Sequence, residues 1–236
     1  MASILDQYGI KEVCDFVFYD IDTGNPVLYL DTLKISTVEQ TGEVVYAQGG
    51  KGNPKLIGWD YGKDITVNLE DALFSPKSMA VMFGDGKVNA TGATVMTKTI
   101  VVEGTADITN YKGATVSTVV YTDATGATVT NRVAGEKYFA TFDVPIKDAR
   151  EIVIGPNTFP GTYRAVGDTF ARAEKDGDDE FFQLEIKKAK ILSENTLTME
   201  AEGDPSVFNM DLSVLRHKNP DGTTEMMRIT QYALAI

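Results

Sequence analysis

Residues that commonly carry out enzymatic chemistry are scarce in this sequence. It contains one histidine, His217, and one cysteine, Cys14. A serine hydrolase needs a histidine base that is oriented by a carboxylate and lies beside an activated serine. His217 stands between Arg216 and Lys218 next to a turn, so we expect an exposed residue at a strand end. Cys14 stands in an apolar strand pattern and is expected to be a small buried side chain.

Phosphate, metal and carboxylate chemistry is also poorly represented. Gly62-Lys63 and Gly86-Lys87 lack the serine or threonine that completes a phosphate loop. The acidic run 176–180 lacks the ligand order of a calcium loop, and no Cys or His spacing indicates zinc. No pair of carboxylates stands out for glycoside hydrolysis. We therefore predict no enzyme, no metal and no cofactor.

Length and charge restrict the class of protein. The chain has 236 residues, of which 43% are hydrophobic, so it is long enough and apolar enough to fold around a core. Its formal net charge is −12, whereas proteins that bind DNA usually neutralise phosphates with lysine and arginine. The sequence shows no signal-peptide pattern and no apolar run of the roughly 20 residues that span a bilayer. We expect a protein of a cytosol-like compartment that does not bind membranes.

The pattern of apolar residues predicts a mainly β protein. Threonine and valine are frequent, and both fit a pleated strand better than a helix. Alternation predicts strands over residues 12–21, 27–39 and 64–69, the first two joined by a turn at 22–26. One short flanking helix is expected over residues 76–83, because Ser75 can cap it and Pro76 suits its first position.

Two segments have unusual composition. Residues 41–62 are rich in glycine around Gly49–Lys55 and predict a long irregular loop, a kind of segment that is often functional. Residues 85–135 are rich in threonine and glycine, and Gly-Ala-Thr-Val occurs there three times, at 92, 113 and 126. The unequal spacing argues against a solenoid, so we expect turns that lead into strands of a hairpin excursion.

The last third of the chain predicts an antiparallel meander. Apolar and polar residues alternate over 182–186, 197–201, 208–214 and 227–231, with turn residues between these runs. We expect this meander to pack on the N-terminal strands within one domain spanning residues 1–236. The predicted fold is therefore an antiparallel β-sandwich or partly closed barrel.

Three segments resemble a known family. They are Ala47–Asp60, Leu69–Ser78 and Glu200–Phe208. They are similar to the major tail tube proteins of tailed bacteriophages, in particular those of phages that infect Gram-positive hosts. None of the three is a catalytic signature, and the threonine-rich tract has no counterpart in the resemblance.

The resemblance implies a structural protein of the virion tail, assembled in the cytoplasm of the host bacterium. Such proteins form hexameric rings that stack into a tube, and the tube conducts DNA into the host. The implied partners are other copies of the chain, sheath or tail-completion and baseplate proteins, and a tape measure protein in the lumen. The loop over 41–62 would bridge subunits, with these candidate contact residues: Tyr46, Gln48, Lys51, Asn53, Lys55 and Trp59.

A tube that conducts DNA should not bind it, and an acidic wall repels phosphates. The polar positions of the C-terminal strands lie opposite the apolar ones and are candidates for the channel lining. They are Gln183, Glu185, Asn209, Asp211 and Ser213. The same positions would also suit an ordinary solvated exterior.

Two other functions fit a β-rich chain of this size. A surface adhesin or carbohydrate-binding module would present an exposed aromatic platform, and the single tryptophan, Trp59, gives that interpretation little support. A hydrolase that uses carboxylates would need a convergent motif, which the sequence lacks. Self-assembly into rings or polymers distinguishes the tube from both.

Overall fold

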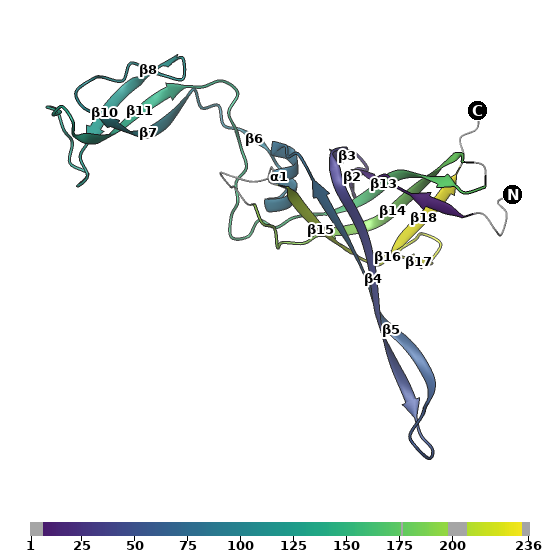
Figure 1. The fold of residues 1–236 in the computed structure, drawn as a ribbon. Helices are drawn as coiled ribbons and strands as arrows, with labels where there is room; N and C mark the ends of the chain where they lie inside the picture. The colour runs from purple at the N-terminus through teal and green to yellow at the C-terminus, as the bar shows by residue number, and fades with distance from the viewer. Residues whose placement is uncertain (1–6, 176, 198–206, 233–236) are drawn as a thin grey trace. The chain divides into compact units, whose positions relative to one another are not determined.

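A computed structural model describes residues 7–175, 177–197 and 207–232 of the chain (Figure 1). The chain forms two compact units. Unit 1 comprises Met1–Lys87 and Ile152–Ile236, and unit 2 comprises Val88–Glu151. Unit 2, with its own small core, covers most of the threonine-rich tract.

Unit 1 is built on one nine-stranded antiparallel sheet. Its main path runs β3-β2-β13-β14-β15-β5-β4, with β1 paired to β13 and β18 paired to β14. The strands are β1 (Tyr8–Ile10), β2 (Asp15–Asp20), β3 (Pro26–Leu30), β4 (Leu33–Gln48), β5 (Lys55–Asp71), β13 (Thr162–Ala173), β14 (Asp179–Ile191), β15 (Phe208–Val214) and β18 (Met227–Tyr232). A small separate hairpin joins β16 (His217–Lys218) to β17 (Thr224–Glu225).

The sheet folds over one shared core. In β15 every second side chain is buried, namely Phe208, Met210, Leu212 and Val214, as the alternation predicts. The same cluster contains Phe16 and Phe18 from β2 at the other end of the sheet path. Two parts of one sheet therefore face each other across a common apolar interior, and the predicted antiparallel sandwich is confirmed.

The predicted helix is confirmed as α1 (Pro76–Phe83). The Ser75 hydroxyl accepts a hydrogen bond from the Ser78 backbone amide at 3.0 Å, which satisfies one of the free donors of the first turn. Val81 and Met82 are buried in the core of unit 1. The helix thus covers part of the apolar interior of the sandwich.

Two predictions of strand layout are wrong. The predicted strand over 27–39 is two strands, β3 and the start of β4, with a break at Asp31-Thr32. The C-terminal strands do not form a sequential meander. β15 pairs with β5 and with the C-terminal end of β14, and β18 pairs with an earlier part of β14 instead of with β15. The predicted strand over 197–201 lies mostly outside the described residues.

The predicted irregular loop over 41–62 is also wrong, because this segment is the outer part of the β4–β5 hairpin. Their ladder continues from Leu33 opposite Asp71 to Gln48 opposite Lys55. Only 49–54 form the turn, where Gly50 and Gly52 adopt positive φ angles of 85° and 88°. We call residues 42–62 the arm, and Figure 1 shows the hairpin extending beyond the rest of the sheet of unit 1.

Unit 2 contains a three-stranded sheet in the order β10-β11-β7. Its small core includes Ala140, Phe142 and Val144. Gly92, Gly113 and Gly126 of the repeated Gly-Ala-Thr-Val all have positive φ angles, and the repeats at Gly113 and Gly126 stand at turns. The strands are β6 (Asn89–Ala90), β7 (Val95–Glu103), β8 (Asn110–Tyr111), β9 (Ala114–Thr115), β10 (Ser117–Thr122), β11 (Lys137–Pro145) and β12 (Arg150–Glu151).

Truncation of one core side chain tests this packing. Phe208→Ala should lower the free energy of unfolding of unit 1 by about 3–5 kcal/mol, because it removes a buried ring that contacts Phe74 at 4.5 Å between centroids. Urea denaturation followed by circular dichroism measures this loss. The neighbouring exposed change Asn209→Ala is the control and should cost less than about 0.5 kcal/mol. Equal stability of the two variants would contradict the assigned strand register.

Candidate assembly surfaces

Among the described residues, no group of His, Cys, Asp and Glu side chains is arranged to hold a metal ion. His217 pairs across β16–β17 with Glu225, and Cys14 is 8% exposed. Burial raises the pKa of the Cys14 thiol, and the carboxylates of Asp168 and Asp15 raise it further. No helix in the described part of the chain is long and apolar enough to span a membrane.

One face of the arm is exposed and mostly apolar, with Glu43 at its root opposite Tyr61, whose hydroxyl donates a hydrogen bond to it. Residues opposite each other in an antiparallel ladder share a face, and here Val45 lies opposite Trp59 and Ala47 opposite Ile57. Val45, Ile57, Trp59 and Tyr61 are each between 52% and 56% exposed. We call this set, with Ala47, the apolar arm face. Aromatic and aliphatic side chains gathered in this way are typical of a surface that a partner covers.

The opposite face of the arm carries Tyr46 and Lys55, two of the predicted contact residues. The Lys55 ammonium lies 3.9 Å from the centre of the Tyr46 ring. A side chain at Gly58 would approach that ring to 3.1 Å, so glycine leaves room for it. Val44 and Leu56 also belong to this face and are exposed. The arm is thus accessible on both sides.

The other predicted contact residues lie at the turn or on the apolar arm face. The Asn53 side-chain amide donates a hydrogen bond to Gln48 at 3.1 Å, which ties the two ends of the turn together. Lys51 is exposed at the tip, and Trp59 lies on the apolar arm face. The sequence prediction missed Val45, Ile57 and Tyr61, although their β-branched and aromatic character was a usable signal.

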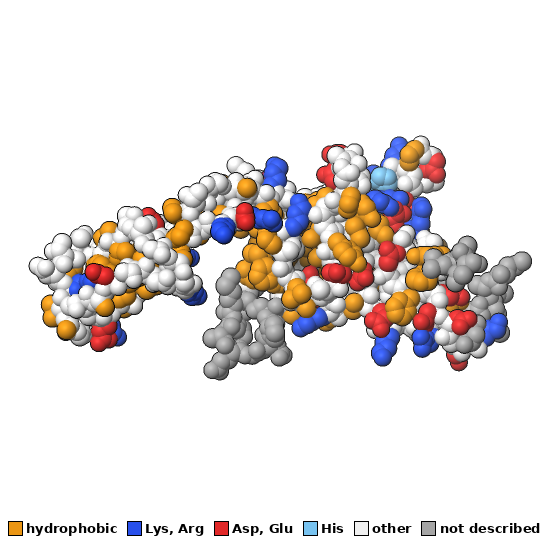
Figure 2. Space-filling model, turned by 90° about the horizontal axis from the view of Figure 1, so that it is seen from above, with side chains coloured by type: hydrophobic (Ala, Val, Ile, Leu, Met, Phe, Trp, Pro, Cys, Tyr) orange, Lys and Arg blue, Asp and Glu red, His pale blue; other side chains and the backbone are white. Residues whose placement is uncertain are grey.

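A second apolar surface of unit 1 lies beside α1. Leu73 and Phe74 precede the helix and are 64% and 59% exposed. Val153 and Ile154 are also exposed, and the chain at Ile152 and Val153 lies next to Gly84 at the end of the helix. Figure 2 shows hydrophobic side chains in patches among charged ones on one face of the protein. Unit 1 therefore offers more than one apolar surface for contact.

Several strands of unit 1 have an unpaired edge. Among the described strands, β3 pairs only with β2, β4 only with β5, and β18 only with β14. An open edge presents free amide and carbonyl groups to a strand from another chain. In β4 this edge runs along the whole arm, so backbone pairing and apolar contact are both available there.

The five candidate channel residues all point away from the core of unit 1, two from β14 and three from the neighbouring strand β15. Gln183 and Glu185 point outward from β14, because Leu184 and Ile186 point to the core. The Gln183 amide donates a hydrogen bond to Asp168 on the neighbouring strand at 2.9 Å. Asn209, Asp211 and Ser213 point outward from β15.

Glu185 is held by two cations. The guanidinium of Arg164 lies 2.6 Å from it and the ammonium of Lys187 lies 2.7 Å from it. Burial disfavours the charged carboxylate, but the hydrogen bonds from Lys187 and Arg164 outweigh that effect and lower the pKa of Glu185. The charge of Glu185 is therefore neutralised locally, and this residue stabilises the sheet.

The outer face of β15–β5–β4 has a different composition. Asn209 lies opposite Glu70, and Asp211 lies opposite Asn68, whose amide donates to it at 2.6 Å. Lys190 stands opposite Ser213 at the border of this face, and its ammonium donates to the Pro160 carbonyl. Along the ladder that joins the three strands, the outward residues are Ile35, Thr37, Glu39, Thr66, Asn68, Glu70, Asn209, Asp211 and Ser213, and the exposed Lys34 stands at the bulge beside Ile35.

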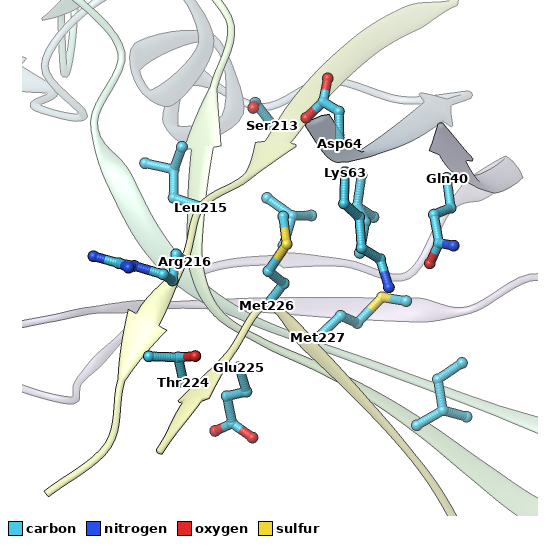
Figure 3. Close-up of a pocket in the computed structure, with 13 residues that line it drawn as sticks. Gln40, Lys63, Asp64, Ser213, Leu215, Arg216, Thr224, Glu225, Met226 and Met227 are labelled. Carbon is cyan, nitrogen blue, oxygen red and sulfur yellow. The ribbon is translucent and has the colours of Figure 1, made fainter. Parts of the chain in front are cut away.

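A hollow of about 860 Å³ lies at the root of the arm (Figure 3). Lys63, Asp64, Arg216 and Glu225 line it together with Met226 and other residues of both charge signs. One carboxylate oxygen of Glu225 accepts a hydrogen bond from Arg228 at 2.7 Å, and the other has no partner among the described atoms. Because the lining carries both positive and negative side chains, it favours neither anionic nor cationic ligands. No pair of a nucleophile and a base is present among the described residues that line the hollow.

The ion pairs of Glu185 give a pH dependence of stability. Because its pKa is lowered in the folded protein, the stabilisation is present above the unfolded value of about 4.3 and is lost as pH falls through the folded value. Glu185→Gln should lower the unfolding free energy by about 1–2 kcal/mol at pH 7, and this difference should shrink below about pH 4.

Urea unfolding of both proteins across this pH range measures the effect. Glu39→Gln is a matched control, because Glu39 is exposed and has no ion pair among the described residues. A Glu185→Gln deficit that stayed constant with pH would show that the ion pairs do not supply it.

Comparison with known proteins identifies the family to which this chain belongs. No curated protein matches this chain. The model of the YomU/Tube protein family matches residues 8–229, a range that includes the arm, the outward side of the sheet and unit 2. This match confirms the resemblance to tail tube proteins. The chain belongs to the YomU/Tube protein family and is a structural component of a bacteriophage tail tube.

Proposed function

We propose that this protein forms hexameric rings that stack into the tail tube through which phage DNA passes into the host cell. The observation that carries this proposal is the arm, whose apolar face and free strand edge are uncovered in the single chain. Burial of apolar surface contributes about 25 cal/mol per Å², so contact with neighbouring subunits would stabilise an assembly. The number six follows from the resemblance to tail tube proteins.

Head-to-tail contact is the arrangement that builds such a tube. A heterologous interface joins two different surfaces of one chain, and it generates a ring when the rotation between subunits closes. The arm is a long projection on unit 1, and the free edges of β3 and β18 belong to other parts of the same sheet. Each subunit therefore carries the arm and, in other parts of the sheet, free strand edges that a neighbouring subunit can contact.

The outer face of β15–β5–β4 is the surface that best suits the channel. Its carboxylates, Glu39, Glu70 and Asp211, face outward, and the exposed Lys34 stands beside them at the bulge of β4. Passing phosphates would meet mainly carboxylates and neutral polar groups there, so DNA would pass without specific binding. Most of the net charge of −12 lies in unit 1, because unit 2 has nearly equal numbers of acidic and basic residues.

The location and partners follow from the same proposal. The protein would assemble in the cytoplasm of the host bacterium around a tape measure protein. Sheath or tail-completion and baseplate proteins would then contact the finished tube. Electron microscopy of concentrated protein without a tag tests the core of this proposal, since rings or tubes support it. Monomers or trimers with affinity for sugars would support an adhesin instead.

The apolar arm face should be necessary for assembly. Ile57→Ser combined with Trp59→Ser should leave folding intact, because both side chains are exposed, and should abolish tubes because the contact loses its apolar area. Circular dichroism and electron microscopy measure the two effects. Ile57→Val with Trp59→Phe keeps the apolar character and should still assemble. Normal tubes from the double serine variant would remove this face from the interface.

Charge on the outer face of β15–β5–β4 should control DNA passage. Glu70→Lys with Asp211→Lys should permit assembly and slow DNA ejection from virions, more strongly at low salt, where screening is weakest. The matched control, Glu103→Lys with Glu151→Lys, makes the same change of charge in unit 2 and should eject normally. Ejection at the wild-type rate by the first variant at low salt would place this face outside the channel.

A further inference from the structure

The arm keeps a regular ladder although both of its faces carry exposed residues in the described part of the chain. Its pairs run from Glu43 opposite Tyr61 to Gln48 opposite Lys55, and Figure 1 shows this hairpin extending beyond the rest of the sheet of unit 1. An isolated two-stranded ribbon is only marginally stable in water. Contacts between the two strands themselves must therefore hold the arm extended in a separate subunit.

One such contact covers a glycine. Tyr46 and Gly58 lie directly opposite each other in the ladder. A Cβ atom on Gly58 would lie 3.1 Å and 3.3 Å from two carbons of the Tyr46 ring, which is closer than ordinary van der Waals contact. The ring therefore occupies the space that a side chain at position 58 would fill. Glycine weakens a strand by itself, and an aromatic side chain on the paired strand compensates by covering its backbone.

A cation holds the same ring toward the turn. The Lys55 ammonium lies 3.9 Å from the centre of the Tyr46 ring, which is a cation–π contact. Lys55 begins β5 and pairs with Gln48, the last residue of β4. The Tyr46 ring thus connects its own strand to two positions of β5, at Gly58 and at the end of the ladder.

The two faces of the arm differ in what their side chains contact. On one face Tyr46 packs over Gly58 and is 40% exposed. On the apolar arm face Ile57 and Trp59 remain 56% and 52% exposed. A ribbon that is stiffened from one face presents the other face in a fixed shape, which reduces the entropy lost when that face binds.

We propose that Tyr46, Gly58 and Lys55 form a clamp that holds the arm extended before a neighbouring copy binds, so that they are positioning residues for assembly. This inference rests on the proposed function and adds to it the state of the arm in a separate subunit. A subunit joins a tube only while its arm is formed. Its apparent affinity for the tube therefore falls in proportion to the fraction of subunits with a formed arm.

Hydrogen exchange in separate subunits tests the clamp without any need for tubes. Tyr46→Ser removes the ring, and the backbone amides of residues 42–62 should then exchange about fivefold faster than in the wild-type protein, as measured by mass spectrometry. Tyr46→Phe keeps the ring and should exchange at close to the wild-type rate. Equal exchange in the Tyr46→Ser variant and the wild-type protein would overturn the inference.

Valine at two glycines of the arm gives a matched pair of variants. Valine forms strands better than glycine, so strand propensity alone predicts slower exchange in both. Gly42→Val should follow this rule, because the nearest atom to a Cβ there is the Tyr61 carbonyl oxygen at 3.7 Å. Gly58→Val should instead exchange faster, because its side chain displaces the Tyr46 ring. Slower exchange in Gly58→Val would show that the ring does not hold the arm.

Tube formation measures the consequence for assembly. The lowest protein concentration that gives tubes in sedimentation and electron microscopy should be about threefold higher for Tyr46→Ser and unchanged for Tyr46→Phe. A higher concentration without faster exchange would make Tyr46 a direct contact with the neighbour and overturn its positioning role. Faster exchange with an unchanged concentration would also overturn the inference, because the shape of the arm would then not limit assembly.

Failure of this inference and failure of the proposed function give different results. If the wild-type protein forms no tubes at any concentration, the proposed function is wrong, and exchange in separate subunits still decides whether the clamp holds the arm. If tubes form and the exchange rates of Tyr46→Ser and the wild-type protein are equal, only the clamp is wrong. Faster exchange together with a raised concentration for tubes, both restored in Tyr46→Phe, supports the clamp and the tube.

Discussion

A two-stranded ribbon cannot bury its own side chains, and the organisation of this protein follows from that constraint. The arm satisfies its internal backbone hydrogen bonds through the β4–β5 ladder but has no second layer to cover Trp59 and Ile57. Its apolar surface is stabilised only by another molecule. A single subunit is therefore fully folded but leaves apolar side chains of the arm exposed, as expected for a protein that functions as a polymer.

The rest of unit 1 supplies the rigid base that such a projection needs. β4 and β5 continue from the arm into the sheet, where Val67 and Leu69 are buried in the shared core. An arm anchored in this way carries any force on its tip into the packed sandwich. The outward side of the sheet differs in chemistry from strand to strand. On β14 Glu185 is paired with two cations, and on β15 Asp211 accepts a hydrogen bond from Asn68 and has no ion pair among the described residues.

Strong local patterns made much of this fold predictable from sequence. Ser75 and Pro76 mark the start of α1, and the alternation from Phe208 to Val214 gives both a strand and its buried face. The arm was mispredicted because the glycines near its turn obscured the strand-forming residues on both sides. Pairing between distant strands was also inaccessible, since alternation says which face of β18 is apolar but not that β14 is its neighbour.

The two ends of unit 2 are joined by the short β6–β12 ladder, in which Asn89 lies opposite Glu151. The chain thus leaves unit 1 after Lys87 and returns at Ile152 through neighbouring positions, as it would across a simple hairpin turn. An insertion with adjacent ends imposes little strain on its host and can be lengthened, exchanged or lost as a cassette. Unit 2 can therefore change in length or sequence while the strands of unit 1 keep their register.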